Sequence, residues 1–187
     1  MIISFNGDHG SGKSTIAERV AKDLNYPRYY MGQIFRDLAK EKNITLAELH
    51  NLCKNDPETD KQVDEYLVKL SKEQSDFIIE SRTAWYFIPN SLKIYLKVSE
   101  EEGAARIYKE LQTSASRKEE DANLNSIEDT QKSEKKRKEE DDARYKKYYG
   151  IDIHQEKNYD LVVDTTSLNR DEVFNKVMRA IRVKLNA

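Results

Sequence analysis

The strongest constraint on this chain is an eight-residue segment near its start, Gly7-Asp8-His9-Gly10-Ser11-Gly12-Lys13-Ser14, which matches the pattern G-x-x-x-x-G-K-[ST]. Glycines let successive backbone N–H groups turn inward, because no Cβ atom obstructs the turn. These donors and the positive end of the following helix form a binding site for phosphate. We therefore predict that a nucleoside triphosphate binds to Gly7, Asp8, His9, Gly10, Ser11, Gly12, Lys13, Ser14 and Thr15.

The sequence on either side of this segment has the order that a phosphate loop requires. Residues 1–6 form a short apolar run typical of a strand, and residues 14–24 carry apolar side chains at helical spacing. The alternative is a glycine- and serine-rich turn that happens to precede a helix, and it does not account for a complete match. In a phosphate loop the Lys13 ammonium bridges the β- and γ-phosphates, and the Ser14 hydroxyl ligates Mg²⁺.

Composition limits the class of protein. The chain has 187 residues, of which 37% are hydrophobic, and this suits a single domain with a substantial core. The formal net charge is only −2, so no overall positive field indicates a nucleic-acid partner. The single cysteine, Cys53, cannot form an internal disulfide and is expected to be a buried structural thiol. The chain has no run of about 18 apolar residues, so we expect no membrane partner. We also expect the protein to be cytoplasmic and to be a monomer.

Strand and helix signals alternate along the rest of the chain. Further strands are expected at residues 26–31, 76–80, 91–98 and 158–164. Helices are expected from Gly32, from Thr45 with Glu48 as its capping partner, from Pro57, from Ser99 to Leu111, and over residues 168–185. Five short strands separated by helices predict an α/β fold with a doubly wound parallel sheet. Residues 32–74 are too many for a plain crossover, so we expect a helical subdomain over the carboxyl edge of the sheet.

Two groups of charged residues are candidates for a site. Glu80 and Arg82 follow a buried apolar strand, and ligands of open α/β sheets collect beyond the carboxyl ends of strands. Residues 113–147 are dominated by Lys, Arg, Glu and Asp, so they cannot belong to the core. Either a solvated charged helix or a partly disordered insertion accounts for most of this stretch. Arg137 and Arg144 are the exceptions, because they lead back into an aromatic segment of the fold.

A phosphate loop alone is compatible with a switch GTPase, a mechanical ATPase and a small-molecule kinase. The chain has no Asn-Lys-x-Asp sequence for reading guanine. Phe77-Ile78-Ile79-Glu80 resembles the apolar run and carboxylate that activate water in ATPases, so hydrolysis remains the main competitor. Phosphoryl transfer needs arginines for the acceptor and the moving group, and the candidates are Arg36, Arg82, Arg106, Arg137 and Arg144. Each alone is more often a surface ion pair, but several in a cleft under a charged lid favour a kinase.

Six sequence blocks extend the comparison along nearly the whole chain. They are residues 7–15, Gly32-x-Ile34-Phe35-Arg36, Asp56-Pro57-Glu58-Thr59-Asp60, Ile79-Glu80-Ser81-Arg82, Leu92-Lys93-Ile94-Tyr95-Leu96-Lys97, and Arg144-Tyr145 through Tyr149-Gly150-Ile151-Asp152. On these blocks the chain resembles the nucleoside monophosphate kinase family, and most closely the archaeal-type cytidylate kinases. The resemblance implies a phosphotransferase that uses ATP and Mg²⁺ to phosphorylate a nucleoside monophosphate, with CMP or dCMP the first acceptor to consider.

The resemblance also implies an architecture and a set of roles. It implies the P-loop NTPase fold with strand order 2-3-1-4-5, a core of residues 1–31, 75–112 and 149–187, acceptor-binding helices at residues 32–74, and a lid at about residues 113–148. Catalytic roles fall to Lys13, Arg82, Arg137 and Arg144. Acceptor binding falls to Met31, Gly32, Arg36, Arg82 and Arg106, and the metal to Ser14 with Glu80 in its outer shell.

One departure from the family pattern bears on the acceptor. Related kinases commonly have a small hydroxyl residue just before the glycine that is Gly32 here, whereas this chain has Met31. A thioether donates no hydrogen bond, so we expect weaker selection of the base. Two alternatives stay open at this stage: a kinase for another small acceptor, and an ATPase or nucleotide-binding module without an acceptor.

Overall fold

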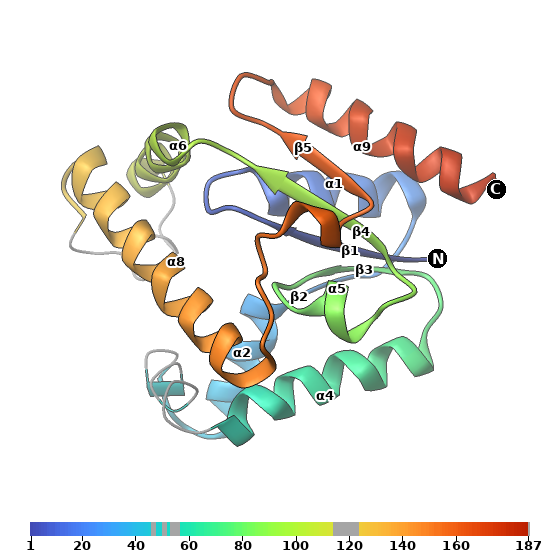
Figure 1. Ribbon diagram of the computed structural model, residues 1–187, viewed down its shortest axis with the longest axis horizontal. Helices are drawn as coiled ribbons and strands as arrows, with labels where there is room; N and C mark the ends of the chain where they lie inside the picture. Colours follow the sequence, from blue (N-terminus) through green and yellow to red (C-terminus); the bar gives the residue numbers. More distant parts are fainter. Residues whose placement is uncertain (46–47, 50–51, 53–56, 114–123, 187) are drawn as a thin grey trace.

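The computed structural model describes residues 1–186 except 46–47, 50–51, 53–56 and 114–123. The expectation for Cys53 therefore lies outside the described residues. One sheet runs through the molecule with helices on both of its faces, and a long helix stands at one side of it (Figure 1). In the part of the chain that is described, no helix combines the length and apolarity needed to cross a membrane.

Five strands form the sheet in the order β2-β3-β1-β4-β5, and every pairing is parallel. The strands are β1 (Ile2–Gly7), β2 (Arg28–Tyr30), β3 (Phe77–Glu80), β4 (Leu92–Lys97) and β5 (Leu161–Asp164). This confirms the predicted doubly wound sheet and its order 2-3-1-4-5. The edge strands are shorter than expected. In particular, Glu156–Asn158 form a 3-10 turn (η1) ahead of β5, so this strand begins three residues later than predicted.

The helices cover the sheet unequally. They are α1 (Lys13–Leu24), α2 (Met31–Glu41), α4 (Pro57–Glu73), α5 (Ala84–Phe87), α6 (Glu100–Thr113), α8 (Ile127–Tyr149) and α9 (Arg170–Leu185). Apolar residues of α1 and α9 pack on one face of the sheet, and those of α4 and α5 pack on the other. The division into core, acceptor-binding helices and lid stays a prediction.

The central strands are apolar on both sides, as a parallel sheet covered by helices requires. In β3, Ile78 faces the α1 and α9 layer, whereas Phe77 and Ile79 face the α4 and α5 layer. All three side chains are fully buried. The next residue, Glu80, ends β3 at the carboxyl edge of the sheet. It is paired with Phe5 of β1 on one side and with Tyr30 of β2 on the other. The fold thus delivers one carboxylate to the edge where the phosphate loop begins.

Helix α8 forms the described part of the predicted lid. It is a single helix of 23 residues, begun by Ser126, whose side chain accepts a hydrogen bond from the Asp129 N–H, and ended by Gly150 in a left-handed conformation. Thr130 is its only buried residue. The helix lies beside α6 and runs across the side of the molecule toward α2 and α4 (Figure 1). The sequence left two alternatives for this stretch, a solvated charged helix and a partly disordered insertion. Residues 127–149 agree with the first.

Two glycines allow α6 to approach the phosphate loop. Gly10 has a φ of 77°, and a Cβ atom there would lie 2.4 Å from the carbonyl oxygen of Gly103 in α6. A Cβ atom on Gly103 would in turn lie 2.7 Å from the carbonyl oxygen of His9. The backbone of the loop and the backbone of α6 are therefore in direct contact, with no room for a side chain between them.

This contact predicts that Gly10→Ala destabilises the fold more than Gly12→Ala. Gly12 has a φ of 80°, which matches the backbone strain at Gly10, but a Cβ atom there meets nothing within 4 Å. We expect about 1–2 kcal/mol for either alanine from the left-handed backbone, and at least about 2 kcal/mol more for Gly10→Ala from overpacking. Urea unfolding of the two ligand-free variants measures the difference, and equal midpoints would contradict the close approach.

Candidate active site

The phosphate loop joins β1 to α1 and leaves donors facing outward. Gly12 caps α1 in a left-handed conformation, and this cap residue makes no side-chain hydrogen bond to the N–H groups of the first turn. The Ser11 side chain is buried, and its hydroxyl has no hydrogen-bond partner among the described residues. Space is open where a Cβ atom of Gly12 would lie. An uncapped helix N-terminus, a buried hydroxyl and open space fit the phosphates of a nucleotide.

Asp8 anchors the start of this loop to β4. Its carboxylate accepts hydrogen bonds from the Tyr95 hydroxyl at 2.6 Å and from the Val98 N–H at 3.1 Å, while its own N–H donates to the Leu96 carbonyl at 2.9 Å. We predicted that Asp8 binds the nucleotide. These bonds to β4 fix the backbone of the loop, and the side chain of Asp8 also lines the pocket beside it. Its contact with a nucleotide stays a prediction.

Glu80 joins the loop to the strand next to it. Its Oε2 accepts a hydrogen bond from Ser14 Oγ at 2.7 Å, and its Oε1 accepts one from Arg28 Nε at 2.6 Å. The side chain of Glu80 is 3% exposed, so the Arg28 charge compensates a buried carboxylate. A hydroxyl and a carboxylate are oxygen groups of the kind that Mg²⁺ prefers. The expected metal site, with Ser14 as ligand and Glu80 in the outer shell, stays a prediction.

Sequence reasoning missed Arg28. Its guanidinium lies 5.3 Å from the ring centroid of Tyr30, and the Arg36 guanidinium lies 5.5 Å from the same centroid. Arg36 also donates a hydrogen bond to the Tyr30 hydroxyl. The predicted acceptor clamp Arg36 is thus connected through Tyr30 and Arg28 to Glu80. One signal in the sequence could have found it. Arg28 is the only charged residue of the expected strand 26–31, which lies next to the strand expected at residues 76–80.

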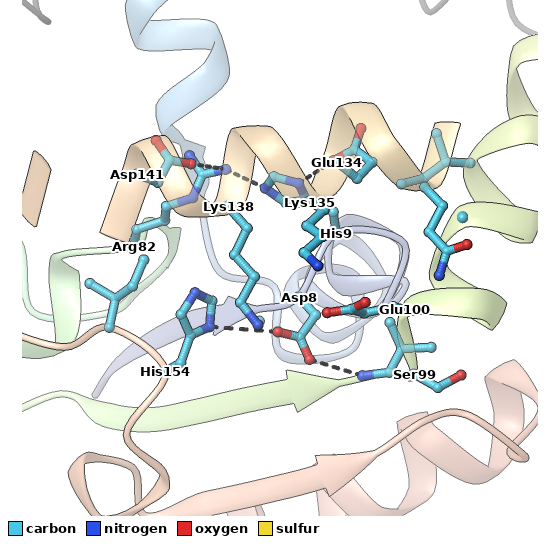
Figure 2. Close-up of a pocket in the computed structure, with 16 residues that line it drawn as sticks. Asp8, His9, Arg82, Ser99, Glu100, Glu134, Lys135, Lys138, Asp141 and His154 are labelled. Atoms are coloured by element: carbon cyan, nitrogen blue, oxygen red, sulfur yellow. Dashed lines mark hydrogen bonds and ion pairs between the residues drawn. The ribbon is translucent and has the colours of Figure 1, made fainter. Parts of the chain in front are cut away.

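Arg82 extends from the end of β3 to the lid helix (Figure 2). Its Nη2 lies 3.0 Å from Asp141 Oδ2, and Arg144 Nη2 donates to Asp141 Oδ1 at 2.9 Å. Arg82 also contacts His9 Nε2, and Glu134 contacts His9 Nδ1. Asp141 therefore connects Arg82 with Arg144, and Arg82 connects both to His9. Sequence reasoning did not single out the two carboxylates of α8 in this group, Asp141 and Glu134.

The protonation state of His9 follows from this group. Burial lowers the pKa of His9, the hydrogen bond to Glu134 raises it, and the Arg82 charge lowers it, with a net decrease. A neutral ring that donates from Nδ1 to Glu134 and accepts at Nε2 from Arg82 satisfies both contacts. Arg137 is exposed on α8 and is close enough to lower the pKa of His9 further. Arg137 and Arg144 thus lie on one helix, and Arg137 is near enough to His9 of the loop to affect its pKa.

Arg106 lies elsewhere than we expected. Its Nη2 donates to the carbonyls of Thr165 and Thr166 at 2.8 and 3.2 Å, and its Nη1 reaches the Gly10 carbonyl at 3.5 Å. These partners place Arg106 between the phosphate loop and the loop after β5. The expected acceptor residues Met31, Gly32 and Arg36 instead lie in α2, where Met31 packs against the apolar layer of α4 and α5.

Comparison with solved structures gives the fold class independently. A shikimate kinase from Bacteroides thetaiotaomicron matches with a TM-score of 0.67 at 13% sequence identity, over 100% of this chain and 99% of that chain. At this identity the match shows the fold alone. It confirms the predicted P-loop kinase architecture.

Comparisons at the sequence level show the family. Two curated relatives have 33% identity: the cytidylate kinase of Halobacterium salinarum, over 97% of this chain and 89% of that protein, and an S-adenosylmethionine-dependent nucleotide dehydratase of Lacinutrix mariniflava, over 94% of this chain. This chain spans only 35% of the Lacinutrix protein. A sequence profile described as the cytidylate kinase-like family matches residues 2–167. As the resemblance predicted, the chain belongs to the cytidylate kinase-like family.

Proposed function

We propose that the protein transfers the terminal phosphoryl group of ATP to a nucleoside monophosphate and forms the diphosphate. The observation that carries this proposal is the meeting of Arg82 and Arg144 on one carboxylate, Asp141, beside the phosphate loop. Two arginines that hold one carboxylate can also hold a phosphate, because both anions accept the paired N–H donors of guanidinium. The names of the relatives support CMP or dCMP as the acceptor.

The residues of the chain divide the work of transfer among them. The loop and Lys13 would hold the triphosphate, and Arg36 with Arg82 would hold the acceptor phosphate. Ser14 would hold Mg²⁺ directly and Glu80 through water, and the metal would neutralise charge on the phosphates. Arg137 and Arg144 would stabilise charge on the group in transit, and α8 would exclude water. Arg106 is closer to the triphosphate side than to the acceptor.

Two other functions compete with this proposal. An ATPase has no need of a second anion site, so the arginines beyond the loop argue against it. A kinase for a different small acceptor would use the same loop and lid. It would differ only in what α2 and its surroundings select.

Product formation from ATP and Mg²⁺ across CMP, dCMP, UMP, AMP and GMP tests the proposal. We expect diphosphate from CMP or dCMP with the highest kcat/KM, and no product from Lys13→Ala, which controls for contaminating kinases. Loss of such a charged group costs about 10²-fold or more in turnover. ATP hydrolysis that equals or exceeds transfer with the best acceptor would overturn the proposal in favour of an ATPase.

Position 31 tests the choice of base. Apolar pockets separate similar ligands by only about 10- to 200-fold, whereas a site whose polar groups pair with the base reaches about 10⁴-fold. We expect Met31→Ser to widen the preference for cytidine nucleotides. Met31→Leu is the matched control, because it keeps the apolar packing of Met31 without adding a hydroxyl. Equal ratios of kcat/KM in the parent and both variants would show that position 31 does not face the base.

The lid arginines should act on the transition state. We expect Arg137→Ala and Arg144→Ala each to lower kcat by about 10²-fold while the affinity for ATP changes far less, because their contacts strengthen as charge develops. Lys136→Ala, on the same helix and exposed, is the control. Turnover measured alongside calorimetric ATP binding gives the comparison. Normal turnover in both arginine variants would leave α8 without a chemical role.

A further inference from the structure

Asp64 is a buried acid of α4 to which the proposed reaction assigns no part. The residue is only 6% exposed, and two hydroxyl groups from other elements donate hydrogen bonds to its carboxylate. Thr83 Oγ1 donates to Oδ1 at 2.9 Å, and the Tyr149 hydroxyl donates to Oδ2. A carboxylate that is removed from water needs such donors, because leaving it unsatisfied is costly. Asp64 therefore connects α4 with the start of α5 and with the carboxyl end of α8.

The hydrogen bond from Thr83 determines the direction of the next one along the chain. A threonine hydroxyl has a single hydrogen, and Thr83 donates it to Asp64. The hydrogen bond of 3.2 Å between Thr83 Oγ1 and Ser81 Oγ must then be donated by Ser81. Ser81 Oγ in turn accepts hydrogen bonds from the N–H groups of Thr83 at 3.1 Å and of Ala84 at 3.2 Å. A continuous series of hydrogen bonds thus runs from the start of α5 to Asp64.

Arg82 is the residue between the two hydroxyl residues of this series. Ser81 and Thr83 are both buried, and the Ser81 N–H also donates to the Phe5 carbonyl of β1 at 3.1 Å. Hydrogen bonds therefore hold the backbone on both sides of Arg82, while its guanidinium extends to Asp141 of α8 at 3.0 Å (Figure 2). A charged side chain is placed accurately only when the groups that support it are fixed. The bonds of Ser81 and Thr83 supply that support.

The turn at residues 81–83 is attached to α8 at two points. One is the ion pair with Asp141, and the other runs from Thr83 through Asp64 to Tyr149. Asp141 and Tyr149 are eight residues apart in the sequence, which corresponds to about 12 Å along a helix axis. A single contact leaves the direction of a helix undefined, whereas two contacts at this separation define it relative to the turn.

We propose that Asp64 is a positioning residue that fixes Arg82 relative to α4 and to the carboxyl end of α8. It does so by accepting the hydrogen bonds of Thr83 and Tyr149 on one carboxylate. Asp64 acts through Thr83, so it is not itself a catalytic group. Because Arg82 is the expected clamp for the acceptor phosphate, the effect of Asp64 on turnover rests on the proposed function, whereas the connection between the elements does not.

Removal of the Thr83 hydroxyl interrupts the series at the residue next to Arg82. Ser81 then loses the acceptor of its hydrogen bond, and Asp64 loses one of its donors. The turn is held by fewer bonds, so Arg82 is less accurately placed for an acceptor phosphate. The phosphate loop, which is expected to hold ATP, keeps its own bonds to β4. The change should therefore weaken the use of the acceptor more than the use of ATP.

A double-mutant cycle in urea unfolding of the ligand-free protein tests the connection itself. Thr83→Val and Tyr149→Phe each remove one donor to the same carboxylate, so the loss of unfolding free energy in the double variant should differ from the sum of the two single losses. Thr83→Val with Tyr29→Phe is the matched control pair, because the Tyr29 hydroxyl donates to a different acceptor, Gln74, at 3.0 Å. We expect additive losses in the control pair. Additive losses in the test pair would overturn the connection through Asp64.

Steady-state kinetics with ATP and the best acceptor test the effect on Arg82. We expect Thr83→Val to raise the KM for the acceptor about 10-fold and the KM for ATP far less, because only the acceptor clamp is displaced. Thr83→Ser keeps the hydroxyl and should restore the parent value. Tyr149→Phe should change the same parameter in the same direction, and Tyr29→Phe should leave both KM values unchanged. A general loss of packing would neither separate the two KM values nor be rescued by Thr83→Ser.

Equal changes of both KM values in Thr83→Val, or no rescue by Thr83→Ser, would overturn the role of Asp64 in placing Arg82. Absence of product from every acceptor with the parent protein would instead overturn the proposed function. In that case the unfolding cycle still decides whether Asp64 connects the turn to α8, because it requires no turnover.

Discussion

The buried carboxylate of Glu80 is the group on which the arrangement of the site depends. A carboxylate that is removed from water is costly unless charge and hydrogen bonds compensate it. Here Ser14 and Arg28 supply both, at 2.7 and 2.6 Å. Because these partners come from α1 and β2, satisfying one charge fixes the phosphate loop and the strand that leads into α2. Arg28 and Arg36 then share the ring of Tyr30, so the order extends toward the acceptor helix.

Beyond Glu80, carboxylates of α8 compensate the charged groups beside the phosphate loop. Asp141 lies between Arg82 and Arg144, and Glu134 contacts His9. A phosphate that binds to these arginines must compete with Asp141 for the same donors. If the proposed function is correct, the acids of α8 compensate the charges of these arginines until a more highly charged phosphate displaces them.

The sequence predicted local motifs, and it predicted the positions of residues that follow from the topology of the sheet. The phosphate loop followed from a complete motif, and the position of Glu80 and Arg82 followed from the rule that ligands gather at the carboxyl ends of strands. The strand order followed from the resemblance to the kinase family. Arg28 did not, because its role depends on the register that puts Tyr30 opposite Glu80, and a strand of three residues does not define its register. Arg106 was expected at the acceptor, but the contact of α6 with Gly10 turns it toward Thr165. Asp141 and Asp142 could not be distinguished within a run of charges.

Helix α8 is attached to the rest of the protein in different ways at its carboxyl end and along its length. At its carboxyl end Tyr149 packs edge-to-face on Phe87 and bonds to Asp64, which anchors that end to α4 and α5. Along the rest of the helix only Thr130 is buried, and its acidic side chains form ion pairs with His9, Arg82 and His154. An apolar face would bind the lid permanently, because water offers apolar groups no alternative partners. Ion pairs and hydrogen bonds differ in this respect, because water or phosphate can replace either partner. A helix anchored by aromatic rings at one end and by ion pairs and hydrogen bonds along its length has the attachment that the proposed lid requires.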